Sequence, residues 1–240
     1  MNILITGGAS GLGNAITRKL AEDINNFVYF TYNASQSNAG EITKEFSNSL
    51  SIKCDFSNSD EVNSLAEKLD QFKLDVLINN AYHGSYLKSH FHKTAPDDFL
   101  ISFNINIIPV IKIAQSAINY FRKNKSGKII TILTSALIEA PPIGSSVYVS
   151  TKAYLKQLTK IWAAENVKFN ITSNSISPSF LLTNLTKDID ERVIDQIRQN
   201  HPMQKLLTVD EVADNVKLMT NALYKKNGFD LILGSTDSIS

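Results

Sequence analysis

Tyr148 and Lys152 are four residues apart, a spacing that puts a phenol and an ammonium group on one face of a helix. Such a pair can move a proton, because the positive charge favours the phenolate form of the tyrosine. Chance supplies about one such spacing in a chain of this composition, and the alternative is a packing tyrosine beside a solvated lysine. Ser135 and the segment Asn79-Asn80-Ala81 favour the chemical interpretation, since each directly follows a strand-like segment.

A glycine-rich segment, Thr6-Gly7-Gly8-Ala9-Ser10-Gly11-Leu12-Gly13, lies between the first strand-like segment and a helical pattern. Glycines permit a tight turn, and the free N–H groups at the start of a helix bind a pyrophosphate. The spacing departs from G-x-G-x-x-G, and a plain turn is the alternative. Its place at the first strand-to-helix junction favours a nucleotide site.

These residues must be positioned by alternating strands and helices. Short β-branched or aromatic runs predict strands, and apolar residues spaced three and four apart predict helices. The strands are expected at 2–6, 27–32, 51–54, 74–79, 128–133, 169–176 and 229–233. Long helices are expected near 97–123, 146–166 and 208–224. The pattern predicts an α/β protein: a Rossmann-type, doubly wound sheet of about seven parallel strands with helices on both faces.

Composition predicts one ordinary globular domain spanning 1–240, because 43% of the residues are apolar and 20% are charged. A net charge of +1 gives no field that would attract nucleic acid or an anionic membrane. The single cysteine excludes an internal disulfide, and no Cys/His cluster has zinc-ligand spacing, so no metal site is expected. The N-terminal segment lacks the features of a signal peptide, and a cytoplasmic location is expected.

The region 179–203 has no strand pattern. Its apolar residues have helical spacing, which predicts one or two short surface helices. Since open α/β folds bind ligands at the carboxyl edge of the sheet, the same segment is also a candidate substrate lid within the domain.

Together these motifs make the sequence resemble the short-chain dehydrogenase/reductase family, of the classical type, over nearly the whole chain. The family's TGxxxGxG corresponds to Thr6, Gly7, Gly11 and Gly13, and its NNA motif to Asn79-Asn80-Ala81. Phe99 followed by Asn106 matches the family's motif in the fourth helix. Asn174-Ser175-Ile176-Ser177-Pro178, with Thr183 beyond it, matches the segment that holds the nicotinamide carboxamide.

The resemblance implies an NAD(P)-dependent oxidoreductase that transfers a hydride between the cofactor and a carbonyl or alcohol. Tyr148 would be the acid/base, with its pKa lowered by the charges of Lys152 and of an oxidised nicotinamide, and Lys152 would also hold the nicotinamide ribose. Ser135 would bind the substrate oxygen, and Asn106 would fix a relay water. The residues implied to bind cofactor are Gly7, Ser10, Gly11, Leu12, Gly13, Asn33, Ser35, Asp55, Phe56, Asn80, Ala81, Tyr148, Lys152, Pro178, Leu181 and Thr183.

Three positions depart from the family pattern. Tyr82 and Ser179 replace glycines, and the usual C-terminal Asp-Gly-Gly is absent around Gly234-Ser235. Tyr82 either narrows the cofactor groove or points into the mouth of the substrate pocket. The missing tail motif calls into question the subunit contacts that the family usually makes at that edge. A homo-oligomer, either a dimer or a tetramer, is still expected.

The segment Thr31-Tyr32-Asn33-Ala34-Ser35-Gln36 bears on the choice of cofactor. It contains no acid to bind a ribose 2′-hydroxyl, which favours NADP over NAD. It also contains no Arg or Lys, so a 2′-phosphate would depend on Ser10, Asn33 and Ser35.

Pro109 lies inside the helix expected at 97–123, three residues after Asn106. Proline has no N–H, so the carbonyl of Ile105 must lose its helical partner and the helix should kink. We expect this irregularity to free a carbonyl for the relay water.

The substrate is left open between two classes. The closest resemblance is to 3-oxoacyl-(acyl-carrier-protein) reductases, whose acidic carrier could meet Arg122, Lys123, Lys125 and Lys168; solvated helix ends are the alternative interpretation of these cations. A sugar or another small ketone is the other substrate class. The hypothesis from a different functional class is a catalytically idle, cofactor-binding regulator.

Overall fold

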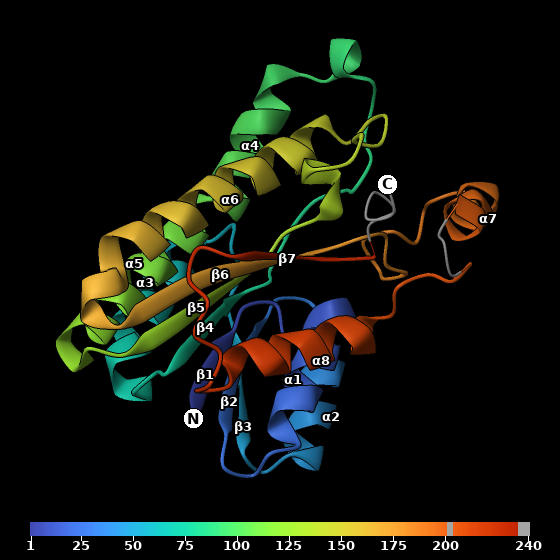
Figure 1. Ribbon diagram of the computed structural model, residues 1–240. Helices are drawn as coiled ribbons and strands as arrows, with labels where there is room; N and C mark the ends of the chain where they lie inside the picture. Colours follow the sequence, from blue (N-terminus) through green and yellow to red (C-terminus); the bar gives the residue numbers. More distant parts are fainter. Residues whose placement is uncertain (201–203, 235–240) are drawn as a thin grey trace.

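A computed structural model describes residues 1–200 and 204–234 of the chain. Its centre is a sheet of seven parallel strands in the order β3-β2-β1-β4-β5-β6-β7 (Figure 1). The order reverses between β1 and β4, which creates the crevice where doubly wound folds bind ligands. The strands are β1 (Asn2–Ile5), β2 (Phe27–Tyr32), β3 (Ser49–Lys53), β4 (Val76–Asn79), β5 (Gly127–Ile132), β6 (Ile171–Pro178) and β7 (Asp230–Leu233).

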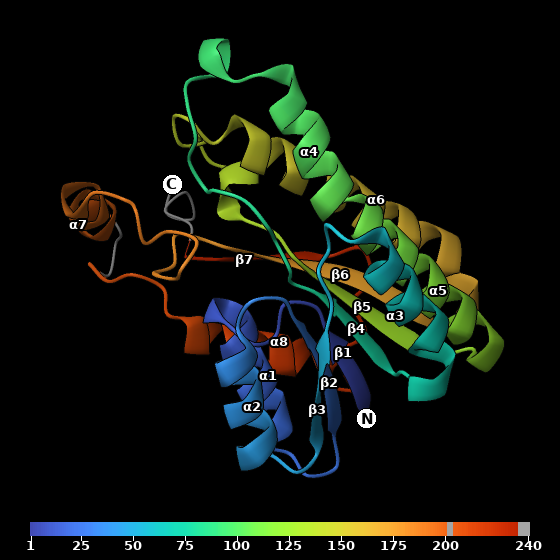
Figure 2. The same cartoon turned by 180° about the vertical axis from the view of Figure 1, so that it is seen from behind.

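Helices cover both faces of the sheet, as Figures 1 and 2 show from opposite sides. One face carries α1 (Gly11–Ala21), α2 (Gln36–Glu45) and α8 (Val209–Thr220). The other carries α3 (Ser59–Phe72), α5 (Ile108–Asn124) and α6 (Ser146–Asn166), with α4 (Pro96–Asn106) packed on α6. Three short 3-10 helices, η1 (Phe91–Lys93), η2 (Ser135–Leu137) and η3 (Val167–Phe169), and the helix α7 (Glu191–Asn200) complete the described elements.

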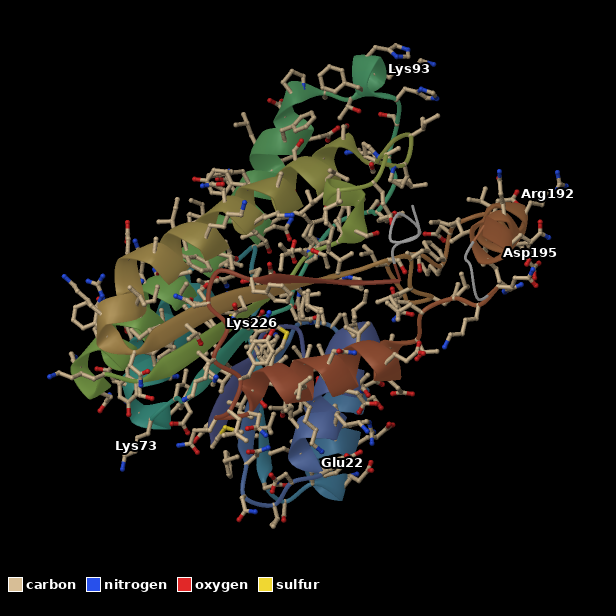
Figure 3. The ribbon with its side chains drawn as sticks, in the orientation of Figure 1. Glu22, Lys73, Lys93, Arg192, Asp195 and Lys226 are labelled. Atoms are coloured by element: carbon tan, nitrogen blue, oxygen red, sulfur yellow. The ribbon has the colours of Figure 1, made fainter. Side chains whose placement is uncertain are left out.

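The core explains why the strands read as nearly continuous apolar runs. Side chains alternate between faces along a strand, so Ile3 and Ile5 of β1 enter one core cluster and Leu4 enters the other. Exposed charged side chains such as Glu22, Lys73 and Arg192 lie outside these layers (Figure 3), whereas Lys152 of α6 is buried. The sequence prediction of a doubly wound α/β sheet is confirmed.

The helix expected at 97–123 is two helices. α4 ends at Asn106, α5 begins at Ile108, and Ile107 between them has φ −103°. Pro109 lies in the first turn of α5, where its missing N–H costs little. The predicted irregularity next to Asn106 is therefore present, as a break between helices and not as a kink within one.

Taken together, α4 and α5 are long and apolar enough to match a membrane span by length and composition alone. In the fold, however, α5 packs against α3 and the sheet, which accounts for its apolar face. The other boundaries differ by a few residues: β3 begins at Ser49, β4 begins at Val76, and α8 ends at Thr220.

Candidate active site

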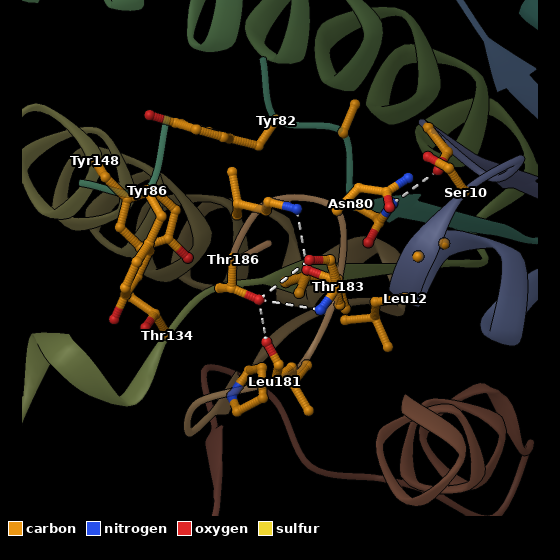
Figure 4. A pocket seen from close by; sticks show the side chains of 18 of the residues that line it. Ser10, Leu12, Asn80, Tyr82, Tyr86, Thr134, Tyr148, Leu181, Thr183 and Thr186 are labelled. Atoms are coloured by element: carbon orange, nitrogen blue, oxygen red, sulfur yellow. Dashed lines mark hydrogen bonds between the residues drawn. The ribbon is translucent and has the colours of Figure 1, made fainter. Parts of the chain in front are cut away.

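A cavity of about 990 Å³ opens at the carboxyl edge of the sheet. All the residues predicted to bind cofactor line it, as do Ser135, Tyr148 and Lys152. Figure 4 shows Tyr82, Tyr86 and Tyr148 gathered at one end and Ser10, Leu12 and Asn80 towards the other. The fold thus brings residues from the whole length of the chain to one site.

The glycine turn between β1 and α1 forms the floor of the cavity. Gly7 has φ +66°, and a Cβ on Gly13 would come within 2.0 Å of the Gly7 carbonyl oxygen. Both positions therefore need glycine. Ser10 precedes α1 without capping it through its side chain, and Ser10 and the first turn of α1 line the cavity, so the free N–H groups at the start of the helix are available there. This arrangement fits a pyrophosphate.

Asn80 ties this turn to β4. Its side-chain amide donates to the carbonyl oxygens of Thr6 at 3.0 Å and Gly7 at 3.1 Å. In return, the Thr6 hydroxyl accepts from the backbone N–H groups of Asn80 at 3.0 Å and Ala81 at 3.1 Å. The NNA segment thus fixes the backbone on which the cofactor would lie.

Tyr148 and Lys152 lie on one face of α6, as their spacing predicts, and both are buried. Lys152 Nζ donates to the Ile132 carbonyl oxygen at 2.8 Å, and burial lowers the pKa of Lys152 to about 8. Burial also raises the pKa of Tyr148, with smaller effects from Tyr86 and Tyr82, against a lowering by the Thr134 hydroxyl.

This direction is opposite to the one predicted from the sequence for Tyr148. The reason is that the Lys152 ammonium is 5.8 Å from the centre of the Tyr148 ring and donates to a backbone carbonyl. Desolvation of the Tyr148 phenol therefore raises its pKa more than the Lys152 charge can lower it. The lowered pKa expected from the sequence therefore needs a further positive charge beside the phenol, which an oxidised nicotinamide carries.

Ser135 begins η2, directly after β5, and its hydroxyl donates to Glu139 Oε2 at 2.9 Å. Glu139 and Thr134 also line the cavity, and neither was predicted from the sequence. Glu139 could have been identified from the sequence, because it follows Ser135 by four residues, the spacing of one helical turn. Thr134 carried no such signal, since only the fold brings it to the phenol.

Asn106 is buried at the end of α4 and does not line the cavity. Its side-chain oxygen accepts from the backbone N–H of His83 at 2.7 Å, and its amide donates to the His83 carbonyl at 2.9 Å. The amide also donates to the Ser102 hydroxyl at 3.2 Å. The side chain therefore holds the segment after β4, and a relay water would have to use the backbone carbonyl of Asn106.

Tyr82 was expected either to narrow the cofactor groove or to point into the mouth of the substrate pocket, and its position lies between these two alternatives. Its ring meets that of Tyr148 edge to face, with centroids 5.0 Å apart, and Lys152 Nζ is 5.6 Å from its centre. Burial raises the pKa of Tyr82 to about 12, and a hydrogen bond with Ser102 opposes the rise. Tyr82 thus packs on Tyr148 and lines the same end of the cavity.

The end of the cavity near β2 is polar and almost uncharged. Asn33 and Ser35 line it, as predicted, and Asp55 is the acid there. The Asp55 carboxylate accepts from the N–H of Ser57 at 2.8 Å and its hydroxyl at 2.7 Å, and these bonds lower its pKa. Asn33 makes a further hydrogen bond to Asp55.

The segment after β6 closes the cavity over the glycine turn. Thr183 lies against Gly11, where an added Cβ would be 3.5 Å from Thr183 Cβ. The Thr186 hydroxyl donates to the Leu181 carbonyl at 2.6 Å and accepts from the Thr183 N–H at 3.0 Å (Figure 4). Beyond this turn, α7 extends past the sheet edge in both Figure 1 and Figure 2, and Ile197 lines the cavity. Residues 201–203 of the proposed lid lie outside the described residues.

The cations proposed to meet an acidic carrier lie at the opposite end of the sheet. Arg122 donates to the Asn166 side chain at 2.7 Å and lies 4.7 Å above the Phe169 ring. Arg122 lies before β5 in the chain, and Ser135 lies after it. The six residues of β5, at a strand rise of ~3.3 Å each, therefore separate Arg122 from Ser135 by about 20 Å. Arg122 is thus part of the structure of a helix end, and within one chain it does not border the cavity.

A model of the family described as "Enoyl-(Acyl carrier protein) reductase" matches residues 7–224. The chain belongs to the short-chain dehydrogenase/reductase family. Members of this family are NAD(P)-dependent oxidoreductases, and the resemblance found in the sequence is confirmed.

Three similar proteins illustrate the relationship. The 3-oxoacyl-(acyl-carrier-protein) reductase FabG of Thermotoga maritima is 27% identical over 225 residues, which are 91% of this chain and 89% of the relative. The solved structure of ElxO with NADP bound is 28% identical, with a TM-score of 0.85 and coverage of 97% and 96% of the two chains. A short-chain dehydrogenase from Burkholderia cenocepacia shares the fold, with a TM-score of 0.86, 24% identity and coverage of 99% and 98%.

The residues of this family member fit a nicotinamide dinucleotide. The uncapped start of α1 and the close approach of Gly7 and Gly13 suit the pyrophosphate. Lys152 keeps two N–H groups beyond its bond to Ile132, which suit a ribose. Among residues 1–200 and 204–234, no group of three or more His, Cys, Asp or Glu side chains is arranged to hold a metal ion.

Proposed function

We propose that this family member reduces a ketone with NADPH, using Tyr148 as the acid/base. The observation that carries the proposal is the convergence of Ser135, Tyr148 and Lys152 on one end of a cavity whose other end fits a dinucleotide. NADPH, when bound, supplies the hydride.

The chain itself supplies the proton and the orientation. Tyr148 donates its phenol proton to the carbonyl oxygen, and the Ser135 hydroxyl hydrogen-bonds that oxygen as negative charge develops on it. Burial makes these interactions stronger than they would be in water. Lys152 holds the ribose and favours the phenolate that remains, and the backbone carbonyl of Asn106 holds the water that returns a proton.

NADP is the proposed cofactor because residues 31–36, at the end of β2, contain no carboxylate that could bind a 2′-hydroxyl. The carboxylate of Asp55 lies after β3 instead, where its Oδ1 accepts from Ser57. The NADP-bound ElxO structure, a relative at 28% identity, gives independent support.

A 3-oxoacyl thioester is one candidate substrate, and the reason is the similarity to FabG at 27% identity. A small polar ketone is the other candidate, supported by the polar and charged groups around Ser135. Consumption of NADPH with a panel of 3-oxoacyl thioesters, sugars and small ketones tests both classes. Tight NADPH binding without turnover of any member of the panel would contradict the proposal.

We also propose that the protein assembles into a homo-oligomer, a dimer or tetramer, through α4 and α6. These adjacent helices expose large apolar side chains, namely Leu100, Ile101, Tyr154 and Ile161. Such an apolar face is typical of a subunit interface. Light scattering after size-exclusion chromatography would test this, and a monomer at micromolar concentration would contradict it. The cytoplasmic location and the absence of membrane or nucleic-acid partners remain predictions.

A further inference from the structure

A carboxylate lies beside the serine that binds the substrate oxygen. The backbone N–H groups of Ile138 and Glu139 both donate to the Ser135 carbonyl, at 2.8 and 3.0 Å. This single turn folds the Glu139 side chain back over Ser135, so that Oε2 accepts the hydroxyl proton at 2.9 Å. Glu139 is half-buried and lines the cavity.

No described basic side chain neutralises Glu139. Among the described cavity-lining residues, Lys152 donates to the Ile132 carbonyl, Lys205 pairs with Glu211 at 2.8 Å, and His83 forms no ion pair with Glu139. The serine hydroxyl is the partner that the structure gives to Glu139. Among residues 1–200 and 204–234, therefore, no ion pair neutralises the carboxylate at this end of the cavity.

The reaction takes this partner away from Glu139. A hydroxyl group has one proton to donate, and in the structure Ser135 directs it to Glu139. When the substrate oxygen accepts that proton, Glu139 loses its donor, and the half-buried carboxylate must take a hydrogen bond from water or from the substrate instead. A substrate that brings its own donor to Glu139 supplies this hydrogen bond.

The walls around Glu139 are aromatic. Tyr86 and Tyr82 meet Tyr148 edge to face, with centroids 5.1 and 5.0 Å apart, and Phe180 lies 6.4 Å from Tyr86. The pKa of Tyr86, raised to about 12 mainly by burial, is raised further by the charge of Glu139, which places the carboxylate near this ring. Aromatic rings beside a carboxylate suit a cationic amine and disfavour an anion.

We propose that Glu139 is a specificity-determining residue that selects ketones carrying a protonated amine close to the carbonyl. Glu139 Oε2 lies 2.9 Å from Ser135 Oγ, and a substrate oxygen that accepts the Ser135 proton would lie at hydrogen-bond distance from the same Oγ, so the two oxygens would be roughly 5 Å apart. An amine one or two carbons from the carbonyl carbon can span that separation. This inference rests on the proposed ketone reduction at this site, and it is independent of the thioester candidate.

The test compares three ketones of similar size: 4-amino-2-butanone, 2-pentanone and 3-oxobutanoate, which are cationic, neutral and anionic. We expect kcat/KM of the wild-type protein for the amino ketone to exceed that for 2-pentanone at least tenfold. Glu139→Gln keeps the size of the side chain and removes its charge. It should abolish this preference and improve relative activity on 3-oxobutanoate.

Glu165→Gln, a change at an exposed position of α6, is the matched control and should keep the wild-type preference. An unchanged ratio of amino ketone to 2-pentanone in Glu139→Gln, with turnover retained, would overturn the inference.

A binding measurement separates failure of this inference from failure of the proposed reaction. Calorimetric titration of 4-amino-2-butanone in the presence of NADP, a pair that cannot exchange a hydride, should show binding to the wild-type protein that is at least tenfold weaker in Glu139→Gln. Equal binding to both proteins would overturn the role of Glu139 even if no ketone is reduced. Selective binding without turnover would contradict the proposed reaction and leave the role of Glu139 standing.

Discussion

The side chain of Asn106 binds the backbone of His83 at both ends, through hydrogen bonds of 2.7 and 2.9 Å. This clamp joins the end of α4 to the segment that carries Tyr82 and Tyr86. It also occupies the side-chain amide of Asn106, which leaves the backbone of this residue for the relay water that the family resemblance implies. The catalytic contribution of Asn106 is therefore expected to come from its backbone, at the break between α4 and α5.

Replacing Pro109 tests this relay. Pro109→Ala restores an N–H that can donate to the Ile105 carbonyl and join α4 to α5 in one helix. We expect the free energy of unfolding to stay equal or to rise by up to about 1 kcal/mol, and kcat to fall roughly tenfold. Unfolding curves and steady-state rates measured on the same preparation check both effects. A stabilised variant with wild-type kcat would show that the break has no role in the relay.

Tyr148→Phe removes the proton donor while preserving the ring that packs on Tyr82. We expect kcat to fall by at least about 1000-fold, because general acid catalysis is lost, while NADPH affinity changes less than about threefold. Single-turnover rates and fluorescence titration of NADPH measure the two quantities. Near wild-type turnover on any substrate would show that another group donates the proton.

Lys152 should make stability depend on pH. Its pKa is about 8 in the folded protein against 10.5 ordinarily. Between these values the unfolded chain holds the proton and the folded chain does not, so the free energy of unfolding rises with pH. The total rise is about 3 kcal/mol, present in full only near pH 10.5 and absent below pH 8.

Lys152→Met should flatten this rise between pH 8 and 10 and stabilise the cofactor-free protein at pH 7. Urea unfolding at several pH values measures the effect. The same slope in the variant and the wild type would show that Lys152 is not the group responsible.

Asn33→Asp should reverse the preference for NADPH. An added carboxylate repels the 2′-phosphate and accepts a hydrogen bond from a free 2′-hydroxyl. We expect at least a tenfold change in the ratio of NADPH to NADH affinity. Asn33→Ala is the control, because it removes the contact with Asp55 without adding charge. Tighter binding of NADH than of NADPH by the unmodified protein would contradict the assignment of NADP.

Local sequence was sufficient for the fold and for most of the site. The alternation of apolar runs and helical spacing fixes parallel strands between helices, and the carboxyl ends of parallel strands meet at one edge. The glycine turn, Asn80, Ser135, Tyr148 and Lys152 could therefore be assigned to one site by their places along the chain. Pro109 likewise predicted an irregularity near Asn106, because the missing N–H is a property of the residue itself, although the structure has a break between two helices where a kink was expected.

Tertiary structure decided what depends on side chains from distant segments. The spacing of Tyr148 and Lys152 suggested a lowered phenol pKa, but burial among Tyr82 and Tyr86 raises it, and burial depends on how α6 packs. The partner of Asn106 is a backbone segment that no spacing rule indicates. Glu139 has the right spacing from Ser135, but the sequence does not show that its carboxylate lines the proposed substrate pocket. That depends on how the segments around the cavity pack together. Electrostatic and desolvation energies depend on three-dimensional surroundings, and the linear sequence records only the groups that take part.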